Sequence, residues 1–142
     1  VPTALLKQSQ EPQKIFNIVM GAIAGISLMV GGIGIMNIML ASILERTREI
    51  GLRRAIGATK DDIKTQFLLE SILISLGGGI VGIILGYLLT SGVRIYTNWQ
   101  TAITLWSILL SVGVSSMVGI LFGYFPAKKA ANLEPIEALR YE

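Results

Sequence analysis

The residues able to carry chemistry are concentrated in one charged segment, ERTREIGLRRAIGATKDDIK, which runs from Glu45 to Lys64. It holds half of the chain's 12 basic residues: Arg46, Arg48, Arg53, Arg54, Lys60 and Lys64. Four acidic residues alternate with them: Glu45, Glu49, Asp61 and Asp62. The chain has no His and no Cys, which removes the usual general base, the commonest metal ligand and all thiolate chemistry. The available chemistry is therefore charge pairing rather than catalysis.

Apolar residues are interspersed with these charges. Ile50, Leu52, Ile56 and Ile63 recur at helical spacing, more often than a merely solvated loop needs. A surface of mixed charge with apolar side chains suits docking to a cytoplasmic protein. Basic loops beside membranes are also ordinary topology signals, and this second interpretation stays open. Topology alone does not require the four acids, so we favour docking.

Three further polar or glycine-rich features have simpler explanations. The run Gly31-Gly32-Ile33-Gly34 lacks the Lys-Ser/Thr of a phosphate loop and lies in an apolar stretch, so we predict no ATP site and no cofactor in this chain. Asn37 is predicted to form a hydrogen bond across helices. Glu70 is predicted to lie at the membrane interface, because no second buried ionisable residue exists to continue a proton relay.

The elements that must position the charged segment are apolar. The chain is 52% hydrophobic and 15% charged, whereas soluble domains are about 25% charged. Three uncharged runs, residues 15–44, 71–93 and 101–127, each reach the roughly 20 residues that cross a bilayer as a helix. We predict an all-α membrane protein with three transmembrane helices. The first run exceeds the hydrocarbon thickness and should tilt or project.

Helix signals also occur within the charged segment. No Pro interrupts residues 45–55, so the first helix can continue there. Two faces are then expected, one with Ile43, Thr47, Ile50 and Arg54 and the other with Arg46, Glu49 and Arg53. Gly57-Ala58-Thr59 should break this helix. Thr59 should N-cap the next, with Asp61 and Asp62 in its first turn, and that helix either enters the second span or bends near Glu70.

The basic residues predict the orientation. Lys7, Lys14 and Arg94 lie on the side of the N-terminal segment, and the other 9 of the 12 lie on the side of the charged segment and the tail. By the positive-inside rule the N-terminus is outside, and the charged segment and the tail 128–142 are cytoplasmic. Within the tail, Pro135 is a plausible first residue of a short C-terminal helix.

Small residues recur at four-residue spacing in every span, which lets membrane helices approach closely. Packing within the subunit is the simpler interpretation; a dimer seam or a sliding surface is the alternative. The glycines concerned are Gly21, Gly25, Gly78, Gly82, Gly86, Gly119 and Gly123.

The run GGIGIMNIMLASILERTREIGLRRAIGATKDDIKTQFLLES closely resembles the C-terminal membrane region of the FtsX-like permease family, and within it the macrolide-exporter (MacB) type of ABC transporter. The ending FPAKKAANLEPIEALRYE resembles the family's ending. The resemblance implies the last three of four spans, with residues 1–14 as the end of a stalk that descends from an extracytoplasmic domain. The chain would then be part of a larger protein in the cytoplasmic (inner) membrane of a bacterium.

The resemblance also implies the partners. Residues 45–66 would be a coupling segment resting on a cytoplasmic ABC ATPase, fused or separate, which binds the ATP and Mg. Asp61 and Asp62 would begin a short coupling helix, and Pro135, Ala138 and Leu139 would make a second contact. The remaining predicted coupling residues are Glu45, Arg46, Glu49, Arg53, Arg54, Gly57 and Thr59. The resemblance implies contacts with a second permease copy and with membrane lipids. It implies a periplasmic adaptor and an outer-membrane duct only if the source has two membranes, and it implies no nucleic acid.

The function implied is transmission of ATPase motion to the external domain, called mechanotransmission, with export of an antibiotic, peptide or similar amphiphile. Within the family the alternatives are lipoprotein extraction and antimicrobial-peptide sensing. A third alternative is a signalling module that controls cell-wall hydrolases. We predict no catalytic site and no metal site in this chain.

Overall fold

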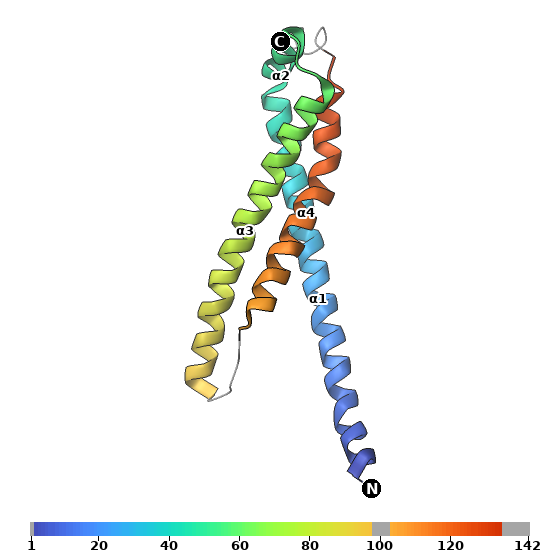
Figure 1. The fold of residues 1–142 in the computed structure, drawn as a ribbon, viewed down its shortest axis with the longest axis vertical. Coiled ribbons are helices and arrows are strands. Elements are labelled where there is room, and N and C mark those ends of the chain that lie inside the picture. The colour runs from blue at the N-terminus through green and yellow to red at the C-terminus, as the bar shows by residue number, and fades with distance from the viewer. Residues whose placement is uncertain (1, 98–102, 135–142) are drawn as a thin grey trace. The chain divides into compact units, whose positions relative to one another are not determined.

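The computed structural model describes residues 2–97 and 103–134, and the regular structure in these two stretches is helical (Figure 1). The helices are α1 (Pro2–Glu45), α2 (Thr47–Ala55), α3 (Lys60–Thr97) and α4 (Leu105–Ala131). Of these, α1, α3 and α4 are long and apolar enough to cross a membrane. The predicted all-α class is confirmed for the described residues, with three apolar helices that could span a membrane. The predicted C-terminal helix at Pro135, Ala138 and Leu139 lies outside the described residues.

The helices extend beyond the predicted apolar runs. The helix capped by Thr59 runs without a break into the second apolar run, which starts at residue 71, because neither Gly nor Pro interrupts the chain between Lys60 and Leu76. The structure therefore makes Asp61 and Asp62 the first turn of a long helix, where the resemblance implies a short coupling helix. α4 begins at Leu105 because the Thr104 side chain accepts a hydrogen bond from the Ser107 N–H at 3.3 Å.

The chain divides into two compact units, residues 1–31 and 32–142. In the first unit, every described side chain from Glu11 to Gly31 is exposed within the single chain. These include the large apolar side chains of Ile15, Phe16 and Ile18. An apolar helix without a protein partner on any side is suited to lipid rather than to water.

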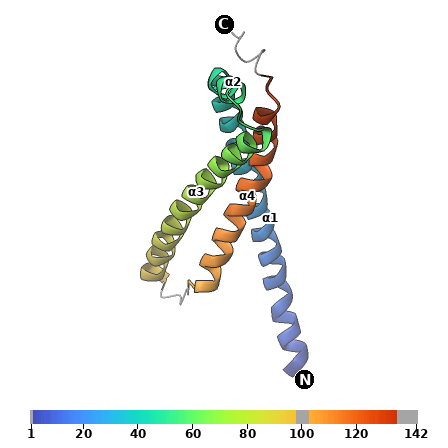
Figure 2. The same ribbon diagram turned by 45° about the horizontal axis from the view of Figure 1, so that its top comes forward.

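The helices of the second unit come together beside α2 (Figure 2), and all four contribute residues to the core there. Its largest members, Met39, Ile43 and Phe67, are almost completely buried. Ile50 of α2 packs into the same cluster, which anchors the charged segment to the spans. The buried cluster comprises Met39, Ile43, Ile50, Ile63, Phe67, Ala127 and Ala130.

A seam of small residues joins α3 to α4. Ser71 Oγ donates a hydrogen bond to the Gly119 carbonyl at 2.9 Å, and Ser75 Oγ donates one to the Ser115 carbonyl. A Cβ on Gly123 would lie 1.9 Å from Ser71 Oγ, so glycine is needed for this approach. The two helices are closest toward α2 and separate toward their other ends (Figures 1 and 2).

The other predicted packing glycines have no such contact. Within the single chain, a Cβ would meet nothing within 4 Å at Gly21, Gly25, Gly78, Gly82 and Gly86. Two other predictions had different outcomes. Asn37, for which we predict a hydrogen bond across helices, is exposed instead. Glu70 is half-buried and pairs with Arg46, and its place at the membrane interface stays a prediction.

Candidate functional site

The charged segment begins with a break at Arg46, between α1 and α2. The Thr47 hydroxyl donates to the carbonyls of Ile43 and Leu44, both at 2.9 Å. Such local bonds compete with regular helix hydrogen bonding. Arg46 leaves helical geometry with φ −98° and ψ 11°, although its N–H still reaches the Ser42 carbonyl at 3.0 Å. The first helix therefore does not continue unbroken into the segment; a nine-residue helix follows instead.

Gly57 ends α2. The Gly57 N–H donates to the Arg54 carbonyl at 3.3 Å, and the Ala58 N–H donates to the Arg53 carbonyl at 3.0 Å. This pair of bonds is the Schellman motif, which satisfies carbonyls at a helix C-terminus. The φ of Gly57 is +115°, a conformation that side-chain-bearing L-residues rarely adopt. The break predicted at Gly57-Ala58-Thr59 is confirmed, and glycine is required for it.

Thr59 then caps α3. Its hydroxyl oxygen accepts a hydrogen bond from the Asp62 N–H at 3.2 Å. Asp62 Oδ2 in turn accepts from the Thr59 N–H at 2.9 Å and from the Thr59 hydroxyl at 2.6 Å. These reciprocal bonds form a capping box with Asp in place of the usual Glu. The predicted N-cap is confirmed, and it fixes where α2 ends and α3 begins.

One face of α2 points into the protein. Ile50 is buried, and Thr47 and Arg54 are half-buried, as the predicted face requires. The Arg54 guanidinium donates from Nη1 to the Ala131 carbonyl at the end of α4, at 2.6 Å. A cation at this position satisfies a terminal carbonyl and opposes the negative end of the helix dipole. Arg54 thus ties the charged segment to α4.

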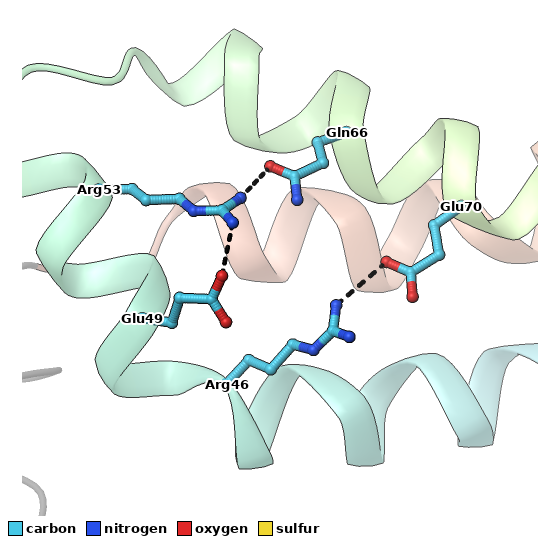
Figure 3. A network of polar contacts seen from close by, with 5 residues as sticks. All are labelled: Arg46, Glu49, Arg53, Gln66 and Glu70. Atoms are coloured by element: carbon cyan, nitrogen blue, oxygen red, sulfur yellow. Dashed lines mark hydrogen bonds and ion pairs between the residues drawn. The ribbon is translucent and has the colours of Figure 1, made fainter.

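A second face of α2 is tied to α3 (Figure 3). Arg53 lies between Glu49 Oε1, 2.5 Å from its Nη2, and Gln66 Oε1, 2.6 Å from its Nη1. Arg46 Nη1 lies 3.7 Å from Glu70 Oε2. Each of these groups is partly exposed, so a single pair contributes at most about 1 kcal/mol. Together they hold α2 and the end of α1 against α3.

The remaining face of α2 is exposed. Arg48, Leu52 and the C-cap residue Ile56 follow one another at i, i+4 spacing and all three are exposed, with Ile56 at 79%. We call these three residues the outer face of α2. Of the four interspersed apolar residues, Ile50 and Ile63 belong to the core, while Leu52 and Ile56 are free to contact a partner.

The predicted coupling residues therefore divide by environment. Arg46, Glu49, Arg53 and Arg54 make contacts within the chain, and Gly57, Thr59 and Asp62 form the turn. Glu45 and Asp61 are exposed, Asp61 within 3.5 Å of Lys64 Nζ. The predicted coupling residues do not include Arg48, Leu52 and Ile56, although Leu52 and Ile56 are among the apolar residues for which the sequence favours docking. In the stretches that the structure describes, no three metal-ligating side chains are grouped as a metal site would need.

Comparison with known proteins identifies the family. Residues 21–135 match the family described as FtsX-like permease C-terminal. The chain is 54% identical over 126 residues, 89% of its length, to a macrolide export ATP-binding/permease protein MacB of Bdellovibrio bacteriovorus. It is 52% identical over 128 residues, 90% of its length, to the uncharacterised ABC transporter permease YknZ of Bacillus subtilis. It is 44% identical over 140 residues, 96% of its length, to a probable syringafactin export ATP-binding/permease protein, SyfD, of Pseudomonas syringae.

The matched part is only a portion of each relative, covering 19% of the MacB protein, 32% of YknZ and 20% of SyfD. Permeases of this family lie in the inner membrane, in agreement with the three exposed apolar helices. The family match begins within α1 and includes the charged segment, α3 and all of α4. The chain belongs to the FtsX-like permease family, as its C-terminal membrane region.

Proposed function

We propose that this chain is the membrane part of an ABC transporter that transmits the motion of a cytoplasmic ATPase to an extracytoplasmic domain. The outer face of α2, Arg48, Leu52 and Ile56, would be the surface that the ATPase contacts. The observation that carries the proposal is the combination of this exposed face with internal ties on the same nine-residue helix. A displacement of α2 by a bound partner would therefore be transmitted to the helices that α2 contacts.

The ties on α2 reach each of the spans. Ile50 packs with Met39 and Ile43 of α1, Arg53 reaches Gln66 of α3, and Arg54 reaches the end of α4. A displaced α2 must therefore move these helix ends with it or break several contacts at once. Buried cores are close-packed and transmit displacement well. This arrangement supports a mechanical role better than a substrate pathway.

We also propose that the charged segment lies in the cytoplasm. The charged segment and the tail carry more Lys and Arg than the other side of the spans, and the positive-inside rule assigns the more basic side to the cytoplasm. The ATPase, rather than the charged segment, would bind ATP and Mg. The open faces at Gly78, Gly82 and Gly86 are available for a second permease copy, because small residues favour close helix contact.

For the transported molecule we propose an amphiphile, such as an antibiotic or a peptide. The names of the relatives support this: two are called exporters, one of macrolides and one of syringafactin. Any periplasmic adaptor or outer-membrane duct would belong to a host with two membranes. Lipoprotein extraction, antimicrobial-peptide sensing and control of cell-wall hydrolases remain the alternatives, which the bound external partner would separate.

The test uses two isoleucines of nearly equal exposure at opposite ends of the spans, Ile56 at 79% and Ile95 at 81%. Each is changed to Asp in the full-length transporter, and binding of the cognate ATPase is measured together with ATPase stimulation. Burying an Ile side chain contributes about 2 kcal/mol. Ile56→Asp should thus weaken binding about 30-fold or more, while Ile95→Asp should leave it unchanged. Equal behaviour of the two variants would show that the outer face of α2 is not the docking surface.

A further inference from the structure

A hollow of about 600 Å³ lies at the end of α4, on the same side as the charged segment. Its wall combines aromatic, basic and amide side chains from the last turns of α4 with the residues that follow the helix. The lining residues are Tyr124, Phe125, Lys128, Lys129, Asn132, Leu133 and Glu134. Leu133 packs against the buried cluster that contains Ile50, whereas the other six take no part in the contacts of α2 described above.

Two features place this hollow at the boundary between lipid and water. The uncharged run of α4 ends at Ala127, and Lys128 and Lys129 follow it directly. Tyr124 and Phe125 are exposed one turn earlier, within the apolar part. A Tyr ring, apolar with a polar hydroxyl, favours the interface of a bilayer, the Phe ring supplies apolar surface, and lysines beyond them extend toward the lipid headgroups. A molecule in the hollow would therefore touch apolar surface at one end and cations at the other.

The lysines are free to bind an anion. Both are exposed, and neither makes an ion pair with any other residue that the structure describes. By contrast, Arg46, Arg53 and Lys64 are already paired with carboxylates. The negative end of the α4 dipole would oppose an anion, but the Arg54 guanidinium already lies on the terminal Ala131 carbonyl. Counting Lys128, Lys129 and Glu134, the lining carries one net positive charge.

We propose that this hollow binds the headgroup of an anionic phospholipid from the leaflet on the side of the charged segment. The phosphate would lie between Lys128 and Lys129, and the glycerol and upper acyl chains would lie against Tyr124 and Phe125. A net charge of −1 on the lipid matches the lining better than a zwitterionic headgroup does. The proposal depends on membrane insertion of α4 but not on ATPase docking, so either can fail without the other.

The test measures which lipids the full-length transporter retains. The protein is reconstituted in nanodiscs that contain equal amounts of phosphatidylcholine, phosphatidylethanolamine and phosphatidylglycerol. Native mass spectrometry then counts the lipids that stay bound to the protein when it is released from the nanodisc. Each lysine near a lipid phosphate raises the affinity for an anionic lipid about 5-fold. The double change Lys128→Gln and Lys129→Gln should therefore lower the preference for phosphatidylglycerol over phosphatidylcholine roughly 25-fold. The double change to Arg should preserve it. Lys14→Gln with Lys60→Gln removes the same charge from two exposed sites and should change it less than about 2-fold.

Glu134 supplies a change of opposite sign. Glu134→Gln should raise the retention of phosphatidylglycerol, because it removes repulsion beside the phosphate, whereas Glu11→Gln should not. If Glu134→Gln instead lowers phosphatidylethanolamine retention, the carboxylate binds an ammonium headgroup and the anionic-lipid proposal is wrong. Displacement of the lipid by millimolar glycerol phosphate would also overturn it, by showing a site for free phosphate. So would loss of ATPase stimulation in the Lys128/Lys129 variant with unchanged lipid retention, since the lysines would then contact protein.

Discussion

Replacing Arg54 with Met should loosen the end of α4, although the substitution is made in α2. The Arg54 guanidinium donates to the carbonyl of Ala131, a residue that is almost fully buried. Met retains most of the apolar stem but has no donor. A hydrogen bond from a charged group contributes about 1.5–3 kcal/mol, and loss of the donor leaves the buried carbonyl unsatisfied. The loss of the cation opposite the helix dipole acts in the same direction.

The local stability of α4 can be read from amide hydrogen exchange of the full-length protein in nanodiscs. A loss of 1.5–3 kcal/mol corresponds to exchange about 10- to 150-fold faster at the amides of the last turn, Lys128 to Asn132. Arg48→Met is the matched control, because Arg48 lies on the same helix, is exposed and makes no ion pair within the described chain. It should change exchange at these amides less than about 2-fold.

The reasoning would be refuted by equal exchange at the end of α4 in the two variants. It would also fail if Arg54→Met accelerated exchange only within α2, since the guanidinium would then stabilise its own helix rather than α4. Arg54→Lys gives an intermediate case, because an ammonium can reach the carbonyl but lacks the planar fork of the guanidinium. We expect it to recover part of the protection.

Three further substitutions have outcomes set by local geometry. Gly119→Ala places a Cβ 3.0 Å from the α3 backbone and should destabilise the protein by about 1–3 kcal/mol. Gly113→Ala, on the same helix and with nothing within 4 Å, should not; SDS titration of the purified protein measures both. Gly57→Ala forces a side chain into φ +115° and should cost about 1–2 kcal/mol in the same titration; an unchanged stability would show that the turn does not require a positive φ. Glu70→Gln removes the ion pair with Arg46 and should cost less than about 1 kcal/mol; a larger loss would show that this pair is less screened than its exposure indicates.

Much of the fold was predictable because its signals are local. Uncharged runs long enough to cross a bilayer predict the three apolar helices, and Gly57 and Thr59 predict the turn between α2 and α3. The unbroken course of α3 from Lys60 into the second span was less predictable. Periodicity shows that a helix can continue from the charged segment into the second span, but not whether it bends near Glu70.

The candidate site depended more on tertiary structure. The small-residue spacing is similar in all three spans, yet only Gly119 and Gly123 among the predicted glycines lie against another helix of the described chain. Spacing shows which residues share a helix face, but not which face meets a neighbour. The same limit applies to Ile50 and Ile56, of which the first is buried and the second exposed.

The amino-acid sequence by itself therefore determined that this chain is an apolar three-span membrane protein with a single charged segment, because hydropathy, charge and capping act over a few residues. Only the tertiary structure decided what each charge does. Arg53 and Arg54 are adjacent and chemically identical, but they point about 100° apart on the helix. One therefore meets Glu49 and Gln66, while the other reaches the end of α4, 77 residues away in the chain.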